Sequence, residues 1–178
     1  KSYHGKLIGS GSISGSYKKN NQFPEMKNCI SFNFNDPDDL EKKILECNNK
    51  GGVYCIIIEP YSASLLESCE DNFIEKLFKL KSKYEFKIIF DEVFTGFYKS
   101  KKMFYFQNFK NVTPDVICLS KTLGGGKSSI SCLVIDDNTY NQAYGKINET
   151  FLHKRVTNLI IHSCQKCIKY PSTKYNVV

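Results

Sequence analysis

The sequence predicts an α/β fold with a mainly parallel sheet flanked by helices. Two short apolar runs, Lys87–Phe90 and Asp115–Leu119, have the length and β-branched content of strands that are buried on both faces. Segments with helical spacing separate the apolar runs, and this alternation favours a parallel sheet over a sandwich or a bundle. The chain has 178 residues, 41% of them hydrophobic and 13% aromatic, which is enough for one well-buried domain.

The first expected elements lie in the N-terminal third of the chain. Residues 9–16 consist mainly of Gly and Ser and predict a flexible loop. Asp36 and the proline after it mark a helix start, and apolar residues at helical spacing predict a helix over 38–48. The apolar run 53–58 then predicts a buried strand that ends at Glu59.

The remaining elements continue the same alternation. Phe73, Leu77 and Leu80 indicate an amphipathic helix. The expected elements, in order, are a helix over about 69–83, strands over 86–93, 116–119 and 131–135, and a helix over 138–146. No internal repeat is present, and residues 165–178 show no clear periodicity.

Asp91 and Lys121 each follow one of the two best-defined strands. The carboxyl ends of parallel strands are where open α/β sheets bind ligands, and 30 positions are enough for a crossover between neighbouring strands. This pair suits an enzyme that uses pyridoxal 5'-phosphate. Lys121 would form the Schiff base and serve as catalytic base, while Asp91 would keep the pyridine nitrogen protonated.

Six short motifs resemble the class III aminotransferases, the group of the ornithine, 4-aminobutyrate and glutamate-semialdehyde enzymes. They occur in the family's order and spacing between about residues 2 and 153, and they are Tyr3-His4-Gly5, Ile58-Glu59-Pro60, Asp91–Phe97, Lys102-Met103-Phe104, Thr113–Val116 and Ser120–Gly126. The family's chains are more than twice as long. The resemblance therefore implies part of the large domain of a type I pyridoxal-phosphate transferase fold.

The resemblance also implies an activity and a domain organisation. Residues 1–158 are expected to be a partial cofactor-binding large domain, and 159–178 a divergent C-terminal tail. The complete protein is expected to transfer an amino group between a small-molecule amino donor and a 2-oxo acid or aldehyde, and to be a homodimer. The family's phosphate-binding loop would precede Tyr3, and its C-terminal domain would follow Asn158.

Further cofactor-binding residues are expected around Lys121 and Asp91. Val93 is placed two residues beyond Asp91 and could pack on one face of the cofactor ring. The resemblance implies that Tyr3 stacks on the other face, and it includes His4 in the site. It also implies that Glu59 orients a substrate group or a gating arginine.

Two positions depart from the family pattern. The family often has Gln where this chain has Phe94, which cannot donate a hydrogen bond to the cofactor. The family's phosphate-binding threonine falls at Val156, so Arg155 or Thr157 would have to replace it. Thr157 is the candidate retained for the site.

Two other functions remain open at this point. A degenerate, non-catalytic relative could act as a binding or dimerisation module. An ATP-binding domain is suggested by the apolar strand ending in Asp91-Glu92 and by Gly126-Lys127-Ser128. A P-loop, however, requires Gly five residues before Gly126, where this chain has Lys121.

Charge and hydropathy exclude several partners. The net charge is +7, but the lysines are scattered among carboxylates, which indicates a solvated basic surface and no nucleic-acid partner. No apolar run reaches the ~18 residues of a membrane span, so no membrane partner is expected either. A cytoplasmic location is the corresponding expectation.

The cysteines are expected to be mostly reduced. Cys55, Cys118 and Cys132 lie in strand-like apolar runs, where a free thiol behaves as a small hydrophobic group. Cys164 and Cys167 have the spacing of half a zinc site, but a single pair of this kind is a weak signal, and no metal is expected.

Overall fold

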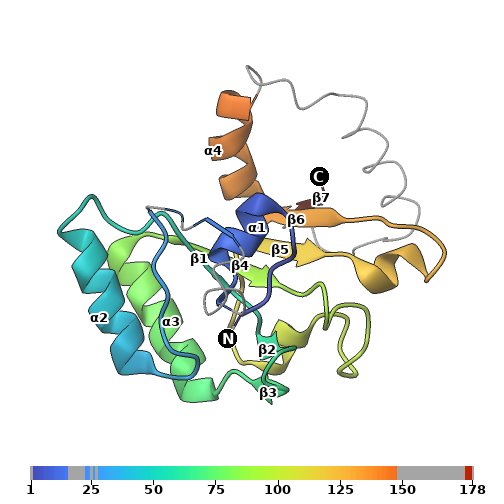
Figure 1. Cartoon of the computed structure of the whole chain (residues 1–178), viewed down its shortest axis with the longest axis horizontal. Coiled ribbons are helices and arrows are strands. Elements are labelled where there is room, and N and C mark those ends of the chain that lie inside the picture. The colour runs from blue at the N-terminus through green and yellow to red at the C-terminus, as the bar shows by residue number, and fades with distance from the viewer. Residues whose placement is uncertain (1, 16–22, 25, 27, 148–174, 178) are drawn as a thin grey trace.

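Five strands form one sheet in the order β1-β4-β5-β6-β7 (Figure 1). The computed structural model describes residues 2–15, 23–24, 26, 28–147 and 175–177. The strands are β1 (Cys55–Ile58), β4 (Lys87–Asp91), β5 (Val116–Leu119), β6 (Cys132–Asp136) and β7 (Tyr175–Val177). The β1–β4 and β4–β5 pairs are parallel, whereas β6 is antiparallel to both of its neighbours. Four of these five strands thus run in the same direction, which confirms the predicted α/β fold with a mainly parallel sheet.

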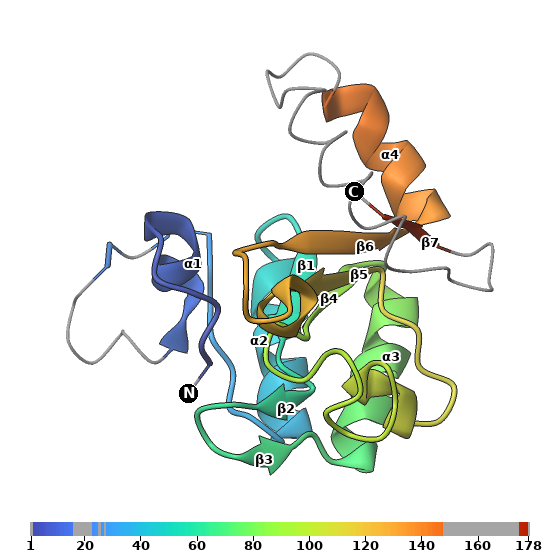
Figure 2. The same cartoon turned by 90° about the vertical axis from the view of Figure 1, so that its right-hand side faces the viewer.

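Helices and short turns connect the strands. The two long helices before β4 lie side by side in Figures 1 and 2, and they contact each other. The helices are α1 (Ile8–Ile13), α2 (Pro37–Asn48), α3 (Asp71–Tyr84), α4 (Asp137–Ile147) and the 3₁₀ helices η2 (Tyr105–Asn108) and η3 (Lys121–Gly124). A small hairpin, β2 (Tyr61–Ser62) and β3 (Glu67–Ser68), follows β1. Among the described helices, none is long and apolar enough to cross a membrane.

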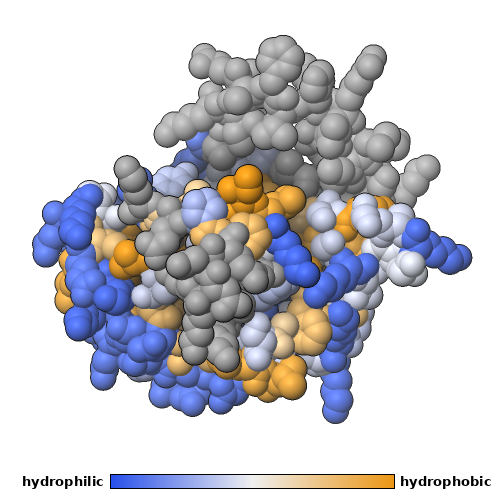
Figure 3. All heavy atoms as spheres, in the orientation of Figure 1, coloured by the Kyte–Doolittle hydropathy of each residue, from blue (hydrophilic) through white to orange (hydrophobic). Residues whose placement is uncertain are grey.

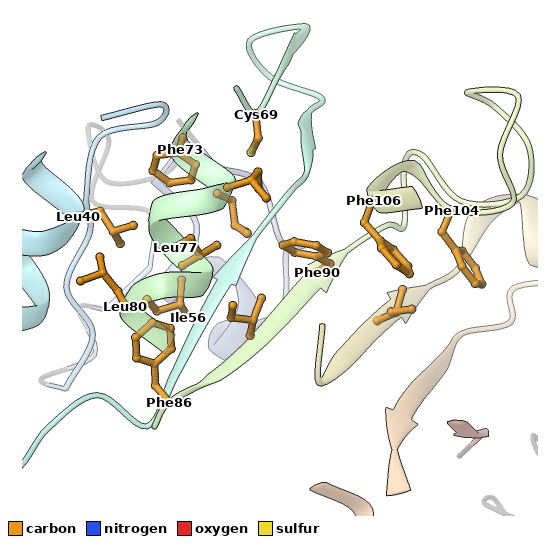
Figure 4. Packing of buried hydrophobic residues seen from close by; sticks show 14 of the residues in the cluster. Leu40, Ile56, Cys69, Phe73, Leu77, Leu80, Phe86, Phe90, Phe104 and Phe106 are labelled. Atoms are coloured by element: carbon orange, nitrogen blue, oxygen red, sulfur yellow. The ribbon is translucent and has the colours of Figure 1, made fainter. Parts of the chain in front are cut away.

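Aromatic side chains connect the sheet to the elements that cover it. Phe90 on β4 contacts both Phe78 of α3 and Phe106 of η2, with ring centroids 6.3 and 6.0 Å apart respectively. Phe104 and Phe106 stack at 5.9 Å, and Figure 4 shows them beside Phe90. This continuous core fixes η2, and the loop before it, against the carboxyl end of β4.

Most of the expected elements are present, and their ends are shifted by at most two residues. The helices expected over 38–48, 69–83 and 138–146 are α2, α3 and α4. The strand expected to continue to Val93 instead ends at Asp91. The reason is a tight turn, in which the Gly96 N–H donates to the carbonyl of Glu92 at 2.8 Å.

The expectation of a flexible loop over 9–16 was wrong, because residues 8–13 form helix α1. The hydroxyl of Ser12 donates to the carbonyl of Ile8 at 2.6 Å, and that of Ser14 donates to Ser10 at 2.7 Å. Gly11 packs directly beneath the ring of Phe23, since a Cβ there would lie 2.7 Å from ring carbons. Tertiary packing therefore overrides the weak helix propensity of Gly and Ser.

The expectation that Cys55 is a core thiol was also wrong. Cys132 is buried and Cys118 half-buried, but Cys55 is exposed because it begins the edge strand β1. The six cysteines in the described part of the chain are free thiols. Cys164 and Cys167 lie outside the described residues. Most of the expected tail does too, although its residues Tyr175–Val177 form β7.

Candidate functional site

Asp91 and Lys121 lie at the same edge of the sheet, on neighbouring strands. Asp91 is the last residue of β4 and pairs in register with Cys118 of the parallel strand β5. Lys121 follows β5 after one intervening residue and opens η3. Both side chains therefore start from the carboxyl ends of adjacent parallel strands, which is the edge where α/β sheets bind ligands.

The carboxylate of Asp91 is buried and held from two sides. Its Oδ2 atom lies 2.8 Å from Nδ1 of His4, and its Oδ1 accepts the N–H of Val93 at 3.1 Å. Both the His4 and the Asp91 side chains are largely shielded from water. The pKa of the Cys118 thiol rises to about 12, mainly through burial and further through the negative charge of Asp91. Asp91 is thus a fixed, shielded acceptor.

Glu59 attaches the N-terminal segment to this edge. Its Oε2 accepts the N–H of Tyr3 at 3.0 Å, and its Oε1 accepts the N–H of Ala63 at 3.2 Å. Burial raises the pKa of Glu59 above its ordinary value of 4.5, although these two N–H groups act in the opposite direction. Since Tyr3 precedes His4, this contact brings His4 to Asp91.

Lys121 is exposed and lies over an aromatic ring. Its Nζ is 5.3 Å from the ring centroid of Phe94, and its backbone has a φ of +43° in the left-handed region. Tyr61 stacks on Phe94 with 6.3 Å between centroids, and Tyr105 contacts Tyr61 at 5.4 Å. An aromatic wall formed by Phe94, Tyr61 and Tyr105 therefore stands beside the lysine amine.

Glu92 fixes the loop that carries Phe94. Its side chain is buried and accepts three hydrogen bonds: from Thr95 Oγ1 at 2.7 Å, and from the N–H groups of Tyr105 and Phe106 at 2.8 Å. Burial raises the pKa of Glu92, and these three donors lower it again in part. Glu92 thereby joins the end of β4 to the start of η2.

The structure connects five of the seven site residues expected from the sequence, whereas Thr157 lies outside the described residues. Tyr3, His4, Glu59, Asp91 and Val93 form one connected group through the hydrogen bonds above, and Lys121 lies at the same sheet edge. Sequence reasoning missed the contact between Lys99 and Phe94, whose centroid lies 5.2 Å from Lys99 Nζ. No motif signals this contact, because it depends on how the loop after Phe94 folds back.

Comparison with known proteins identifies the family. The model of the class-III aminotransferase family matches residues 1–177. The chain belongs to this family. An adenosylmethionine-8-amino-7-oxononanoate aminotransferase of Methanocaldococcus jannaschii is 30% identical to it, over 83% of this chain and 38% of that protein. A glutamate-1-semialdehyde 2,1-aminomutase of the same organism is 36% identical, over 66% of this chain and 28% of that protein.

Solved structures agree with this family in fold. A transaminase from directed evolution by ancestral reconstruction has a TM-score of 0.74 at 20% identity, over 86% of this chain and 37% of that one. The ornithine aminotransferase from Toxoplasma gondii has a TM-score of 0.65 at 22% identity, over 75% and 31% of the two chains. This class-III chain thus spans less than two-fifths of the length of these relatives.

Proposed function

We propose that this chain is the cofactor-binding part of a pyridoxal-phosphate-dependent aminotransferase, with Lys121 as the amine that bonds to the cofactor's aldehyde carbon. The single observation that carries the proposal is the pairing of a buried, hydrogen-bonded Asp91 with an exposed lysine on adjacent parallel strand ends. The complete protein would transfer an amino group from a small-molecule donor to a 2-oxo acid or aldehyde.

The residues at this edge fit pyridoxal 5'-phosphate. Each Asp91 oxygen has one hydrogen-bond partner among the described residues, so each retains a lone pair that can accept the N–H of a protonated pyridine. Lys121 Nζ forms no ion pair with the described residues, which leaves the amine available. When bound, the cofactor supplies an electron-withdrawing ring that stabilises negative charge on the substrate carbon.

Each residue of the site has a distinct role in this proposal. His4 orients the Asp91 carboxylate through Nδ1, so that Asp91 holds the proton on the ring nitrogen. When it is not bonded to the cofactor, the free amine of Lys121 would move the proton at the substrate carbon. Glu59 holds Tyr3 at the edge, where its ring can cover one face of the cofactor, and Val93 is the candidate for the other face.

A non-catalytic relative that acts as a dimerisation module is the second candidate, and an exposed apolar surface could form its dimer interface. Leu7 and Ile8 at the start of α1 are 80% and 72% exposed. Figure 3 shows hydrophobic atoms gathered over this part of the molecule. A second copy of the chain would cover such a surface in either candidate function, so the homodimer belongs to both proposals.

Spectroscopy separates the two candidates. Addition of pyridoxal phosphate to the chain is expected to give an absorbance band near the visible edge that disappears on borohydride reduction. Lys121→Ala should abolish the band, whereas Lys127→Ala, in an exposed position six residues later, should retain it. Equal bands in the wild type and in Lys121→Ala would favour the non-catalytic module.

A further inference from the structure

A second lysine lies over the aromatic ring that Lys121 contacts. Lys99 Nζ is 5.2 Å from the centroid of Phe94, and Lys121 Nζ is 5.3 Å from the same centroid. Both lysines belong to connecting segments at the carboxyl edge of the sheet, one after β4 and the other after β5. The site therefore contains two amines, and the roles proposed above use only one of them.

The backbone of the loop positions Lys99. Phe97 and Tyr98 have φ values of +65° and +63°, a left-handed conformation that is unfavourable for residues with a Cβ. Their N–H groups both donate to the carbonyl of Met103, at 2.7 and 3.3 Å. The resulting reversal returns Lys99 toward Phe94, whose carbonyl accepts a hydrogen bond from Lys99 Nζ at 2.6 Å.

The two ammonium groups lack a carboxylate partner among the described residues. The nearby acids are engaged elsewhere: Asp91 with His4 and Val93, and Glu92 with three donors of its own loop. Partial desolvation lowers the pKa of Lys99, and the positive charge of Lys121 lowers it further. Two like charges around one ring attract an anion.

We propose that Lys99 binds the oxyanion, a carboxylate or a phosphate, of the carbonyl compound that reacts with the Lys121 amine. After one hydrogen bond to Phe94, the Lys99 ammonium retains two N–H donors for this anion. Once Lys121 has bonded to the carbonyl carbon, Lys99 remains as the cation beside it. This inference rests on the proposed role of Lys121, and it names anionic carbonyl compounds as the preferred class.

Reductive trapping measures this preference without a complete enzyme. The 178-residue chain is incubated with an aldehyde and cyanoborohydride. The Lys121 amine condenses with the aldehyde, releasing water, and hydride from cyanoborohydride then reduces the C=N bond to a stable secondary amine. Peptide mass spectrometry gives the rate at Lys121. The trapping rates of succinic semialdehyde and butyraldehyde are compared to measure the preference for a carboxylate. The rates of pyridoxal phosphate and pyridoxal are compared to measure the preference for a phosphate.

We expect one or both of the anionic aldehydes to be trapped faster than its uncharged counterpart. The comparison that shows this difference identifies the oxyanion as a carboxylate or a phosphate. Lys99→Gln should reduce this preference about fivefold, the effect of one partly exposed ion pair, and Lys99→Arg should retain it. Lys127→Gln is the control for net charge. The proposal is overturned if Lys99→Gln leaves both preferences unchanged, or if Lys127→Gln reduces them equally.

The two proposals can fail separately. If pyridoxal phosphate and pyridoxal react equally slowly at Lys121 while the preference for succinic semialdehyde depends on Lys99, the oxyanion site stands and the cofactor proposal fails. If pyridoxal phosphate reacts at Lys121 independently of Lys99, the cofactor proposal stands and the oxyanion site fails. Circular dichroism of Lys99→Gln and Lys99→Arg checks that both variants are folded.

Discussion

Replacing Glu92 by Gln should destabilise the fold by about 1–3 kcal/mol. In the wild type the two carboxylate oxygens accept three hydrogen bonds, two at Oε2 and one at Oε1. A Gln amide has one acceptor oxygen. If the amide oxygen of Gln takes the place of Oε2, it still accepts the hydrogen bonds from Thr95 and Tyr105. The NH₂ group then takes the place of Oε1 and faces the N–H of Phe106. The buried N–H of Phe106 then has no acceptor, and the cost of this unsatisfied donor accounts for the expected loss of about 1–3 kcal/mol.

The effect of Glu92→Gln should also depend on pH. Burial raises the pKa of Glu92 in the folded state above its ordinary value of 4.5, so the folded state binds the proton more tightly than the unfolded state. Wild-type stability therefore falls as pH rises from 4.5 through the folded-state pKa. Gln does not titrate, so the difference in stability between wild type and variant should shrink across this window.

Urea unfolding followed by circular dichroism measures both effects, since the chain contains no Trp. Glu70→Gln is the matched control, because Glu70 is exposed and its side chain makes no capping hydrogen bond to α3. The control should change the unfolding free energy by less than about 0.5 kcal/mol. A wild-type-like midpoint for Glu92→Gln, or a difference that grows with pH, would refute the reasoning.

Two further changes test the loop after β4 by the same unfolding measurement. Gly96→Ala should lower the free energy of unfolding by about 1–3 kcal/mol, because the new Cβ would lie 2.9 Å from the Glu92 carbonyl oxygen and from the Leu119 side chain. Gly9→Ala is the control, since a Cβ at Gly9 would meet open space. Tyr98→Gly should raise the free energy of unfolding by about 0.5–1 kcal/mol, because Gly adopts the left-handed backbone conformation without strain. The Tyr98 side chain is 68% exposed, so its removal loses little packing. The exposed Tyr54 lacks a positive φ, so Tyr54→Gly should be destabilising. A change of the same sign in the free energy of unfolding at both tyrosines would contradict this account.

The parts of the fold that local signals specify could be predicted from the sequence. Asp36 and Pro37 mark the start of α2, and the side chain of Asp36 does cap that helix by accepting the Asp39 N–H. The two apolar runs that end in Asp91 and precede Lys121 are adjacent parallel strands. Periodicity and strand-end chemistry were sufficient for these elements.

Features that depend on tertiary contacts could not be predicted in this way. Helix α1 includes the tertiary contact between Gly11 and the ring of Phe23, which helical periodicity does not reveal. The exposure of Cys55 follows from the edge position of β1, which the sequence does not reveal. Lys99 reaches Phe94 through left-handed residues that local propensity disfavours.

The most direct test of the central claim is to map where pyridoxal phosphate bonds to the chain. The chain is incubated with one equivalent, reduced with borohydride, digested and sequenced by mass spectrometry. We expect the reduced adduct to lie predominantly on Lys121 and to decrease in Asp91→Asn, which removes the carboxylate that would hold the ring nitrogen. An adduct spread over Lys121, Lys127 and the other exposed lysines, with no effect of Asp91→Asn, would contradict the proposed site.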